Sequence, residues 1–545
     1  MIASKKNIEN EISGVLKKFD ITDKIEIRYS NISGVDLQCN NLVRYSNNSN
    51  LPSIKTEIIL VMEKNKWIDN IEISDKNFIN MTFSTEYFFE YSQLLEKHIF
   101  KNNNNSVIFD YGGPNIGKDL HVGHIRTLNI GRSLYNIFKL SGYEVISDIH
   151  FGDWGMPVSH IIAYIEHKNL KLEDLSYEDL EVIYPKANQL SQENKDFYEL
   201  AKSIAMNLNS KNENYISKWR KIYDLAIPNI KTLLNKLGHN FDWYFGESDV
   251  VEETNLVVLK AVEEGKVKKD SGALISTEEV DPPILITKSD GSYLYLTTDL
   301  GTVLFREKKN DFNKYIYVVD SRQQNHFDQL FKTVKHFGLS QSEFFHVGFG
   351  TINGPDNKPF KTRDGGVYKL NVLFEDIKEK LKKYNSEELV LNTLTNTVLT
   401  YSDLLPNRNQ NYIFDVDKFT DINGKTGIYI QYAQVRARKL LDNSTLSGSY
   451  NIDLELNNEE RNLLLLITKF NYFFTLSLNN MEPHHLAEYL FNLSQAFNSF
   501  YTNNKIFSDE ISQDLQSNRL KIVESFHSAV NLIFTCLGIE AVNSM

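Results

Sequence analysis

The sequence predicts a multidomain α/β protein, in which a parallel-sheet domain with a helical insertion stands between a small α+β domain and an all-α helix bundle. At about 100–200 residues per domain, a chain of 545 residues makes more than one domain. Apolar strands alternate with amphipathic helices after residue 105, and helical periodicity alone continues after residue 390. We therefore expect domains at residues 1–105, 106–390 and 391–545, with the insertion at about 160–280.

The first hundred residues predict the α+β domain. Apolar residues at helical spacing indicate an opening helix before residue 20. Strand-like segments then follow at Ile54–Met62, Trp67–Ile73 and Phe78–Phe83. A helix is expected over Thr85–Phe100, and the polar tract Asn102–Asn105 predicts a linker.

The next segment predicts a parallel sheet. Strand character at Val107–Phe109, a helical pattern over Gly123–Leu140 and a second strand at Glu144–Ile149 form a βαβ unit. After the insertion, whose composition carries no chemical signal, we expect the sheet to resume. The expected strands are Pro283–Thr287, Ser292–Leu296, Tyr315–Asp320 and Phe344–Gly350. Beyond them, apolar residues at i, i+3, i+4 and i+7 spacing predict the bundle.

Charge limits the classes of partner. The 59 Lys and Arg residues are outnumbered by 71 Asp and Glu, which gives a net charge of −12. This balance excludes a general polycation, so any nucleic acid must be bound by a local basic groove.

Two cysteines, Cys39 and Cys536, are too few for a disulfide scaffold or a Cys-rich zinc site. We expect no zinc and no metal ligands from the protein. No purely aliphatic run approaches the roughly 20 residues of a membrane span, and charges interrupt the N-terminus where a signal sequence would be apolar. A cytoplasmic protein without membrane contact, and a monomer, is expected.

The most informative stretch lies between the first strand of the βαβ unit and its helix. It runs from Asp110 to His124 and contains four glycines, Lys118 and the motif His121-Val122-Gly123-His124. Glycines permit close backbone approach, and a helix N-terminus offers free N–H donors and a partial positive charge that suit phosphate. A Gly-rich turn with two structural histidines is the alternative for this motif taken alone.

The motif does not stand alone. The chain resembles class I aminoacyl-tRNA synthetases through its His-Val-Gly-His sequence, and arginyl-tRNA synthetases in particular through an ordered set of segments. These segments are Pro114-Asn115-Ile116, Gly152-Asp153-Trp154-Gly155, Lys288-Ser289-Asp290-Gly291, Tyr295–Asp299, Asp320-Ser321-Arg322-Gln323, Lys358–Arg363, Thr426-Gly427, Gln431-Tyr432-Ala433 and Arg436. The resemblance implies a Rossmann-like catalytic domain, a tRNA-elbow-binding N-terminal domain and an anticodon-binding bundle.

The resemblance also implies a reaction and its substrates. Arginine would be activated by ATP, with Mg²⁺, to arginyl-adenylate and then transferred to the 3′ end of tRNA(Arg). His121 and His124 would bind ATP, Gly123 would leave room for the adenine, and Lys118 would reach the α-phosphate. Lys358 and Lys361 would belong to the mobile signature loop of the family. Which of Lys118 and Lys361 does the catalytic work stays open, as does the register of that loop by one residue.

Arginine would be held by residues from several segments. A guanidinium is a planar fork of donors that carboxylates match in bidentate geometry. By similarity, Asp110 and Asp299 would hold it, Tyr295 would lie along it, and Asn115 and Gln323 would hold the amino and carboxylate groups. On the bundle, Tyr432 and Arg436 would lie near the tRNA. Gly112-Gly113 and Thr298 depart from the common family pattern without removing a required donor.

Two rival hypotheses come from other classes. One is a relative that activates another amino acid or serves no tRNA, such as a nucleotidyltransferase with the same histidine signature. It predicts no anticodon-binding bundle, whereas this chain has helical sequence left over for one. The other is a catalytically retired tRNA-binding module, which should have lost His121, His124 or Asp299; all three are present.

Overall fold

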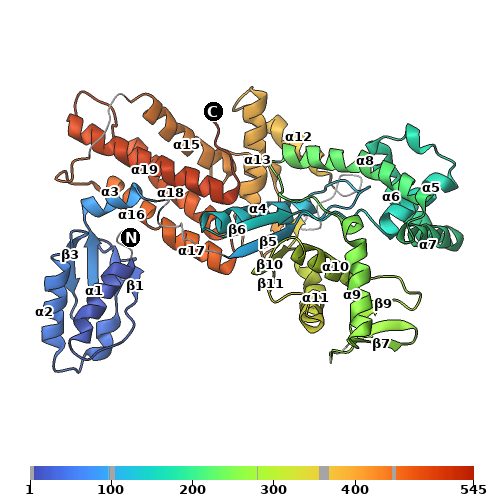
Figure 1. Ribbon diagram of the computed structural model, residues 1–545. Coiled ribbons are helices and arrows are strands. Elements are labelled where there is room, and N and C mark those ends of the chain that lie inside the picture. Colours follow the sequence, from blue (N-terminus) through green and yellow to red (C-terminus); the bar gives the residue numbers. More distant parts are fainter. Residues whose placement is uncertain are drawn as a thin grey trace.

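The computed structural model describes residues 5–95, 97, 105–278, 280, 282–354, 368–444 and 450–545. The molecule is elongated (Figure 1), with the helical bundle and the N-terminal unit at one end and the helical insertion at the other. A parallel sheet lies between them. The predicted fold class is confirmed.

The N-terminal unit is a four-stranded antiparallel sheet, in the order β1-β2-β4-β3, covered by two helices. Its elements are α1 (Lys5–Lys17), β1 (Ile27–Tyr29), β2 (Leu37–Cys39), η1 (Asn41–Tyr45), α2 (Leu51–Met62), β3 (Ile68–Ile73), β4 (Ile79–Phe83) and α3 (Thr85–Ser92). The opening helix and two of the three predicted strands are therefore present.

The third prediction was wrong, because Ile54–Met62 forms most of helix α2 rather than a strand. Its buried residues Leu51, Ile54, Ile58 and Met62 recur at helical spacing, and Pro52 stands in the first turn, where its missing N–H costs nothing. The β-branched residues of this stretch favour a strand only weakly. The helical spacing of the buried residues therefore determines that the segment forms a helix.

The central sheet is parallel throughout, in the order β11-β10-β5-β6. Its strands are β5 (Ser106–Tyr111), β6 (Glu144–Asp148), β10 (Lys314–Val318) and β11 (Glu343–His346). Helix α4 (Gly123–Leu140) connects β5 to β6, as the βαβ pattern predicted. The register places Asp110 of β5 beside Asp148 of β6 and Tyr317 of β10. Three polar side chains thus meet where the strands end.

The insertion is helical, but it ends earlier than expected. Helices α5 (Met156–His167), α6 (Tyr177–Glu193), α7 (Lys195–Asn209) and α8 (Glu213–Lys236) form it, with a short η3 (Leu172–Asp174). The chain then returns to the sheet, where Trp243 bridges Asp148 and Gly246 bridges Phe151 in parallel. Segment η4 (Glu247–Val250) and helix α9 (Val251–Glu263) follow directly.

Two strands expected to rejoin the central sheet do not. The segment Pro283–Thr287 supplies β9 (Leu285–Thr287), which lies in a separate antiparallel sheet with β7 (Val267–Asp270) and β8 (Ala273–Ser276). The segment Ser292–Leu296 contains no strand, because Tyr295 begins helix α10 (Tyr295–Glu307). Alternating apolar residues over five positions were too short a signal to separate a strand from a helix start.

The remaining elements complete the parallel-sheet unit and the bundle. They are η5 (Ser321–Gln323), α11 (Gln324–Phe337), β12 (Ile352–Asn353), α12 (Leu370–Leu381), α13 (Glu388–Leu404), β13 (Tyr412–Ile413), α14 (Val416–Phe419), α15 (Gly427–Asp442), α16 (Asn458–Thr468), α17 (Phe470–Asn480), α18 (His484–Asn503) and α19 (Gln513–Leu537). In the part of the chain that the structure describes, α19 alone is long and apolar enough to cross a membrane by length and composition. Since 67% of that apolar window is buried, it is the core helix of the bundle.

A buried ion pair joins the sheet unit to the bundle. Arg126 of α4 and Asp403 of α13 are 1% and 0% exposed, with 3.2 Å between Nε and the carboxylate. Arg126 also donates to the carbonyl of Gln410 (2.7 Å) and lies over the Tyr412 ring. Removing one partner of a fully buried pair leaves the other charge uncompensated.

We therefore expect Asp403→Asn to lower the free energy of unfolding by about 3–5 kcal/mol, measured by urea unfolding followed by tryptophan fluorescence. The matched control is Asp224→Asn, which removes the acid of an exposed pair with Arg220 and should change stability by less than about 1 kcal/mol. Equal effects of the two substitutions would contradict a structural role for the buried pair.

Candidate active site

His121 lies in the turn between β5 and α4, His124 lies in the first turn of α4, and the two rings contact each other. Their ring centroids are 4.1 Å apart. The backbone N–H of His121 donates to Nδ1 of His124 (3.0 Å), and the N–H of Gly123 donates to Nδ1 of His121 (3.1 Å). Both Nδ1 atoms therefore act as acceptors, which leaves the proton of each neutral ring on Nε2.

Electrostatics keeps these rings neutral. Burial lowers the pKa of His124 to about 3, with a further contribution from His121. Burial also lowers the pKa of His121, and Lys118 adds to the effect. The pair can thus donate hydrogen bonds at neutral pH without carrying charge. Gly123 is required here, because a Cβ would come within 2.8 Å of the His121 ring.

A cavity of about 420 Å³ opens over this turn. It lies at the carboxyl ends of β5 and β10, where open α/β sheets bind ligands. Five of the predicted site residues line it: Asp110, His121, Gly123, His124 and Gln323. The rest of its wall comes from Tyr111–Gly113, Val122, Arg126, Thr127, Arg322 and the two segments Val318–Asp320 and Phe349–Ile352. Its size and position fit a nucleotide.

Lys118 and Asn115 occupy the loop before the histidines but do not line this cavity. The Lys118 ammonium lies 5.3 Å from the ring centre of Tyr184, on helix α6. Asn115 packs against Gly152, where any Cβ would collide with its side-chain oxygen. This contact explains why a glycine stands at position 152, the first residue of the Gly152-Asp153-Trp154-Gly155 motif.

Asp110 already has a guanidinium partner within the chain. Nη2 of Arg306 lies 2.6 Å from Asp110 and 2.8 Å from Asp148, and Nε of Arg306 is 3.1 Å from Asp148. Arg306 is fully buried, whereas the Asp110 side chain is 18% exposed and faces the cavity. The charge of Asp110 is therefore balanced by Arg306, and one side of its carboxylate stays accessible from the cavity. The sequence did not indicate this ion pair.

Asp299 lies one turn into α10 and pairs with a histidine. Its carboxylate is 2.6 Å from Nε2 of His326, on helix α11. Burial lowers the pKa of His326, but the hydrogen bond and ion pair with Asp299 outweigh it, so the pKa is raised. The pair with Asp299 therefore favours the protonated form of His326.

A second carboxylate stands close to Asp299. Burial raises the pKa of Glu247 to about 8, with contributions from Asp153 and Asp299. Burial and Glu247 also raise the pKa of Tyr295 to about 12, with contributions from Tyr184 and Asp299. In the described ranges, neither Glu247 nor Asp299 forms an ion pair with Lys or Arg.

The acidic group and the cavity share a neighbour. Burial raises the pKa of Tyr317, and although Arg306 opposes the rise, Asp110 and Asp299 both add to it. Both carboxylates therefore lie close to the Tyr317 hydroxyl. Tyr317 therefore links the cavity to this acidic group, which holds two carboxyl groups, Asp299 and Glu247, without a Lys or Arg partner among the described residues.

Three residues of this region escaped the sequence analysis. Glu247 follows the helical insertion, where the composition carried no chemical signal. Arg306 lies two helical turns after the expected site residue Asp299 on α10, and His326 lies one turn after Gln323, at the start of α11. This helical spacing from expected site residues is the feature of the sequence that could have identified them.

The tRNA-contact candidates lie on helix α15 of the bundle. The Arg436 guanidinium stacks over the rings of Tyr432 (4.1 Å) and Tyr501 (5.0 Å) and donates to the Tyr432 hydroxyl (3.0 Å). Arg436 also donates to the Asn498 side chain. The signature-loop candidates Lys358 and Lys361 lie outside the described residues.

Comparisons with known proteins agree along the whole chain. The family models that match describe tRNA synthetases class I (R), catalytic domain, over residues 91–416, a DALR anticodon binding domain over 430–545 and an arginyl tRNA synthetase N terminal domain over 4–83. The chain is 31% identical to an arginine–tRNA ligase of Agathobacter rectalis, with 90% of each chain covered. It is 33% identical to that of Alkaliphilus oremlandii, with 81% of each covered.

Solved structures show the same fold. Arginyl-tRNA synthetase of Plasmodium falciparum is 25% identical, covers 99% of each chain and has a TM-score of 0.79. That of Thermus thermophilus, at 17% identity, has a TM-score of 0.79 over 100% of each chain and shows the fold alone. The catalytic-domain model covers more than half of the sequence, and the chain therefore belongs to the arginyl-tRNA synthetase family of class I.

Proposed function

We propose that this protein attaches arginine to tRNA(Arg) in two steps, of which the first consumes ATP. The arginine carboxylate attacks the α-phosphorus of ATP, giving arginyl-adenylate and pyrophosphate. The terminal ribose hydroxyl of the tRNA then attacks the acyl carbon and releases AMP. The observation that carries the proposal is the pair of carboxyl groups of Asp299 and Glu247, which have no Lys or Arg partner in the described ranges, near a cavity lined by the two histidines.

The chain's own contribution is positioning and charge stabilisation, since no covalent enzyme intermediate is required. His121 and His124 donate Nε2–H to ATP, and Gly123 leaves space for the adenine. Lys118 is held only by a ring contact among the described residues, so its ammonium can swing to a phosphate. Lys358 and Lys361 would supply further positive charge from the loop.

Magnesium would enter with the triphosphate. The carboxylates in the cavity wall, Asp110 and Asp320, are already paired with Arg306 and Arg322. Since Mg²⁺ keeps several waters and prefers phosphate oxygens in such sites, these carboxylates would supply few of its ligands. The ion would screen the charge of the phosphates during attack.

Arginine would lie between the cavity and the acidic group. Its guanidinium would take the place of the His326 imidazolium on Asp299, with Glu247 accepting from the other edge and Tyr295 along the side chain. Asp110 would offer its accessible side, and Asn115 and Gln323 would hold the α-amino and carboxylate groups. A planar fork matches several carboxylates at once, whereas the compact ammonium of lysine does not.

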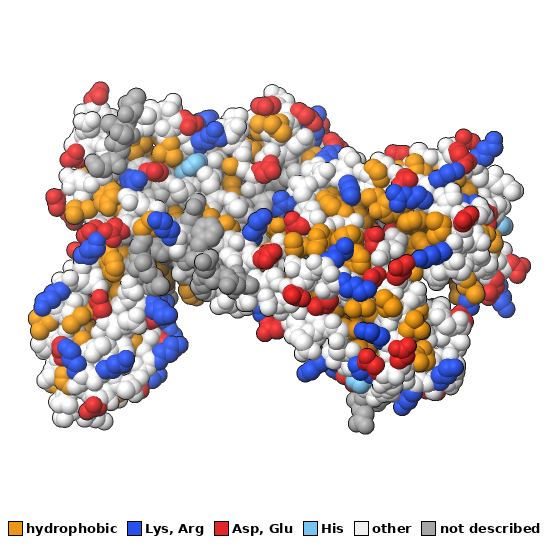
Figure 2. Space-filling view, in the orientation of Figure 1, with side chains coloured by type: hydrophobic (Ala, Val, Ile, Leu, Met, Phe, Trp, Pro, Cys, Tyr) orange, Lys and Arg blue, Asp and Glu red, His pale blue; other side chains and the backbone are white. Residues whose placement is uncertain are grey.

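The remaining proposals concern the whole molecule. We place the N-terminal domain at 1–105, the catalytic domain at 106–390 and the anticodon-binding domain at 391–545, and we propose a cytoplasmic monomer. Acidic and basic side chains are intermixed over the face seen in Figure 2, which supports local rather than general binding of tRNA. The stacked side chains of Tyr432 and Arg436 would together contact the tRNA.

The activity is tested with purified protein, arginine, ATP and tRNA(Arg). We expect AMP formation that requires both arginine and the tRNA. Lysine, methionine and citrulline serve as competing substrates, because citrulline keeps the shape but lacks the charge. Charging of another amino acid, or no charging with a tRNA bearing an arginine anticodon, would reject the proposal.

Replacement of Asp299 should remove arginine use selectively. Losing one partner of a desolvated charge pair costs about 2 kcal/mol or more, so we expect Asp299→Asn to raise the Michaelis constant for arginine at least about 30-fold. The Kd for tRNA should stay within about twofold. Asp328→Asn, an exposed acid on α11, is the control; if Asp299→Asn behaved like it, Asp299 would have no part in arginine binding.

The Michaelis constant for arginine should fall as pH rises from 6 to 8.5. A bound guanidinium disfavours protonation of both His326 and Glu247, so binding releases protons and is favoured at higher pH. Each proton released contributes up to about tenfold per pH unit. His326→Gln should flatten the lower part of the profile, and Glu247→Gln the part near pH 8.

The Michaelis constant for ATP is the internal control for this titration. His121 and His124 stay neutral over the whole range, because burial lowers the pKa of both. We therefore expect no parallel change for ATP. A Michaelis constant for arginine that rose with pH would show that arginine does not replace a proton at Asp299.

A further inference from the structure

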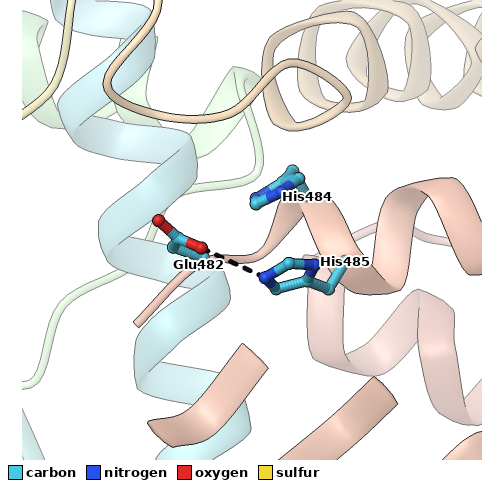
Figure 3. A group of neighbouring side chains, drawn as sticks. All are labelled: Glu482, His484 and His485. Atoms are coloured by element: carbon cyan, nitrogen blue, oxygen red, sulfur yellow. Dashed lines mark hydrogen bonds and ion pairs between the residues drawn. The ribbon is translucent and has the colours of Figure 1, made fainter. Parts of the chain in front are cut away.

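Three potential metal ligands gather at the turn that joins α17 to α18, and none of them lines the cavity described above. Glu482 precedes α18, and His484 and His485 open it. One ligand atom from each lies within 4.8 Å of the other two. Figure 3 shows the Glu482 carboxylate bonded to the His485 ring, with His484 beside both. No other such group occurs in the described ranges of the chain.

We propose that Glu482, His484 and His485 bind a divalent transition metal ion such as Zn²⁺. Two imidazoles and one carboxylate are a zinc-type donor set, whereas Mg²⁺ and Ca²⁺ prefer oxygen ligands alone. Three protein ligands leave one coordination position for water. The expectation of no zinc rested on the scarcity of cysteine and did not consider this cluster.

The distances fit an ion after small side-chain movements. Ligands about 2.0–2.2 Å from a tetrahedral zinc ion lie about 3.3–3.5 Å apart, and Nε2 of His485 is 3.1 Å from the Glu482 carboxylate. The two rings are 3.9 Å apart at their centroids and tilted by 37°. All three ligand atoms lie within 4.8 Å of one another, so side-chain rotations can bring them to these separations.

Two features point to a ligand rather than to an ordinary polar cluster. Nδ1 of His484 is buried and makes no hydrogen bond within the described part of the molecule, which costs free energy unless something occupies it. The Glu482 carboxylate has no Lys or Arg partner among the described residues. Its second oxygen accepts from Asn407 (3.3 Å), as an outer-shell residue would hold it.

The position of the site gives it a structural consequence. Arg408 donates to the carbonyl of Met481 (3.0 Å), in the same turn, and to the carbonyl of Gly348 (2.5 Å). Gly348 directly precedes Phe349 and Gly350, which line the nucleotide-sized cavity. A bound ion would fix the turn on which Arg408 rests and so brace the bundle against the cavity wall. The proposal is independent of the ligase activity.

The test is a zinc titration of the full chain after chelation, in competition with a chromophoric chelator of micromolar affinity. We expect one tight equivalent per chain, lost in the His484→Asn/His485→Asn double variant and at least tenfold weaker in Glu482→Gln. His167→Asn, which removes an exposed histidine of α5 outside the cluster, should keep it. An unchanged equivalent in the double variant, or no binding by the wild type, would overturn the proposal.

A second measurement does not depend on the double variant folding. Co²⁺ added to the wild-type protein should give the strong visible absorption of a four-coordinate site, and Zn²⁺ should abolish it. The same absorption should weaken in Glu482→Gln. A weak, solvent-like cobalt spectrum in the wild type would overturn the site.

Discussion

The structure depends on one guanidinium buried where three elements of the catalytic unit meet. Arg306, from α10, bridges Asp110 of β5 and Asp148 of β6, which the parallel register places side by side. Two adjacent carboxylates would repel each other in a buried position, so the register of these strands requires a cation there. Arg306 supplies it and ties α10 to the sheet. Because Asp299 lies on the same helix, the same ion pair fixes where Asp299 stands.

Charge is divided between the two parts of the site. The histidine turn offers neutral Nε2–H donors, and Arg126 and Arg322, each paired with a carboxylate, also line the cavity, so a polyanion finds hydrogen bonds there. Around Asp299 and Glu247, the titratable His326 is the ion-pair partner in the described part of the chain, and a permanent cation can replace it. A ligand matches both parts if one end carries a cation and the other end carries a carboxylate that reacts with a phosphate group. This division, rather than any single residue, favours arginine as the amino acid.

Local signals predicted the elements that local chemistry determines. The β5–α4–β6 unit and the histidine turn follow from strand and helix periodicity with glycines between them, and they are present as predicted. The strand predictions for Ile54–Met62 and Ser292–Leu296 were wrong, because a short apolar run does not distinguish a strand from the buried face of a helix. The partners Arg306, His326 and Glu247 come from other elements, brought together by tertiary packing that no local pattern encodes. Hence the sequence indicated Asp110 and Asp299, but not that each would already have a partner.

The helix that begins at the histidines also holds the bundle. From α4, Ser133 donates to the carbonyl of Cys536 (3.0 Å) and Asn136 to that of Thr535 (2.8 Å), both in α19. Further toward its start, Arg126 pairs with Asp403 of α13 and also lines the cavity. A packed helix cannot bend freely, so a shift of α19 must either carry α4 with it or break these bonds. The bundle and the histidine turn are therefore mechanically joined through helix α4, which both require.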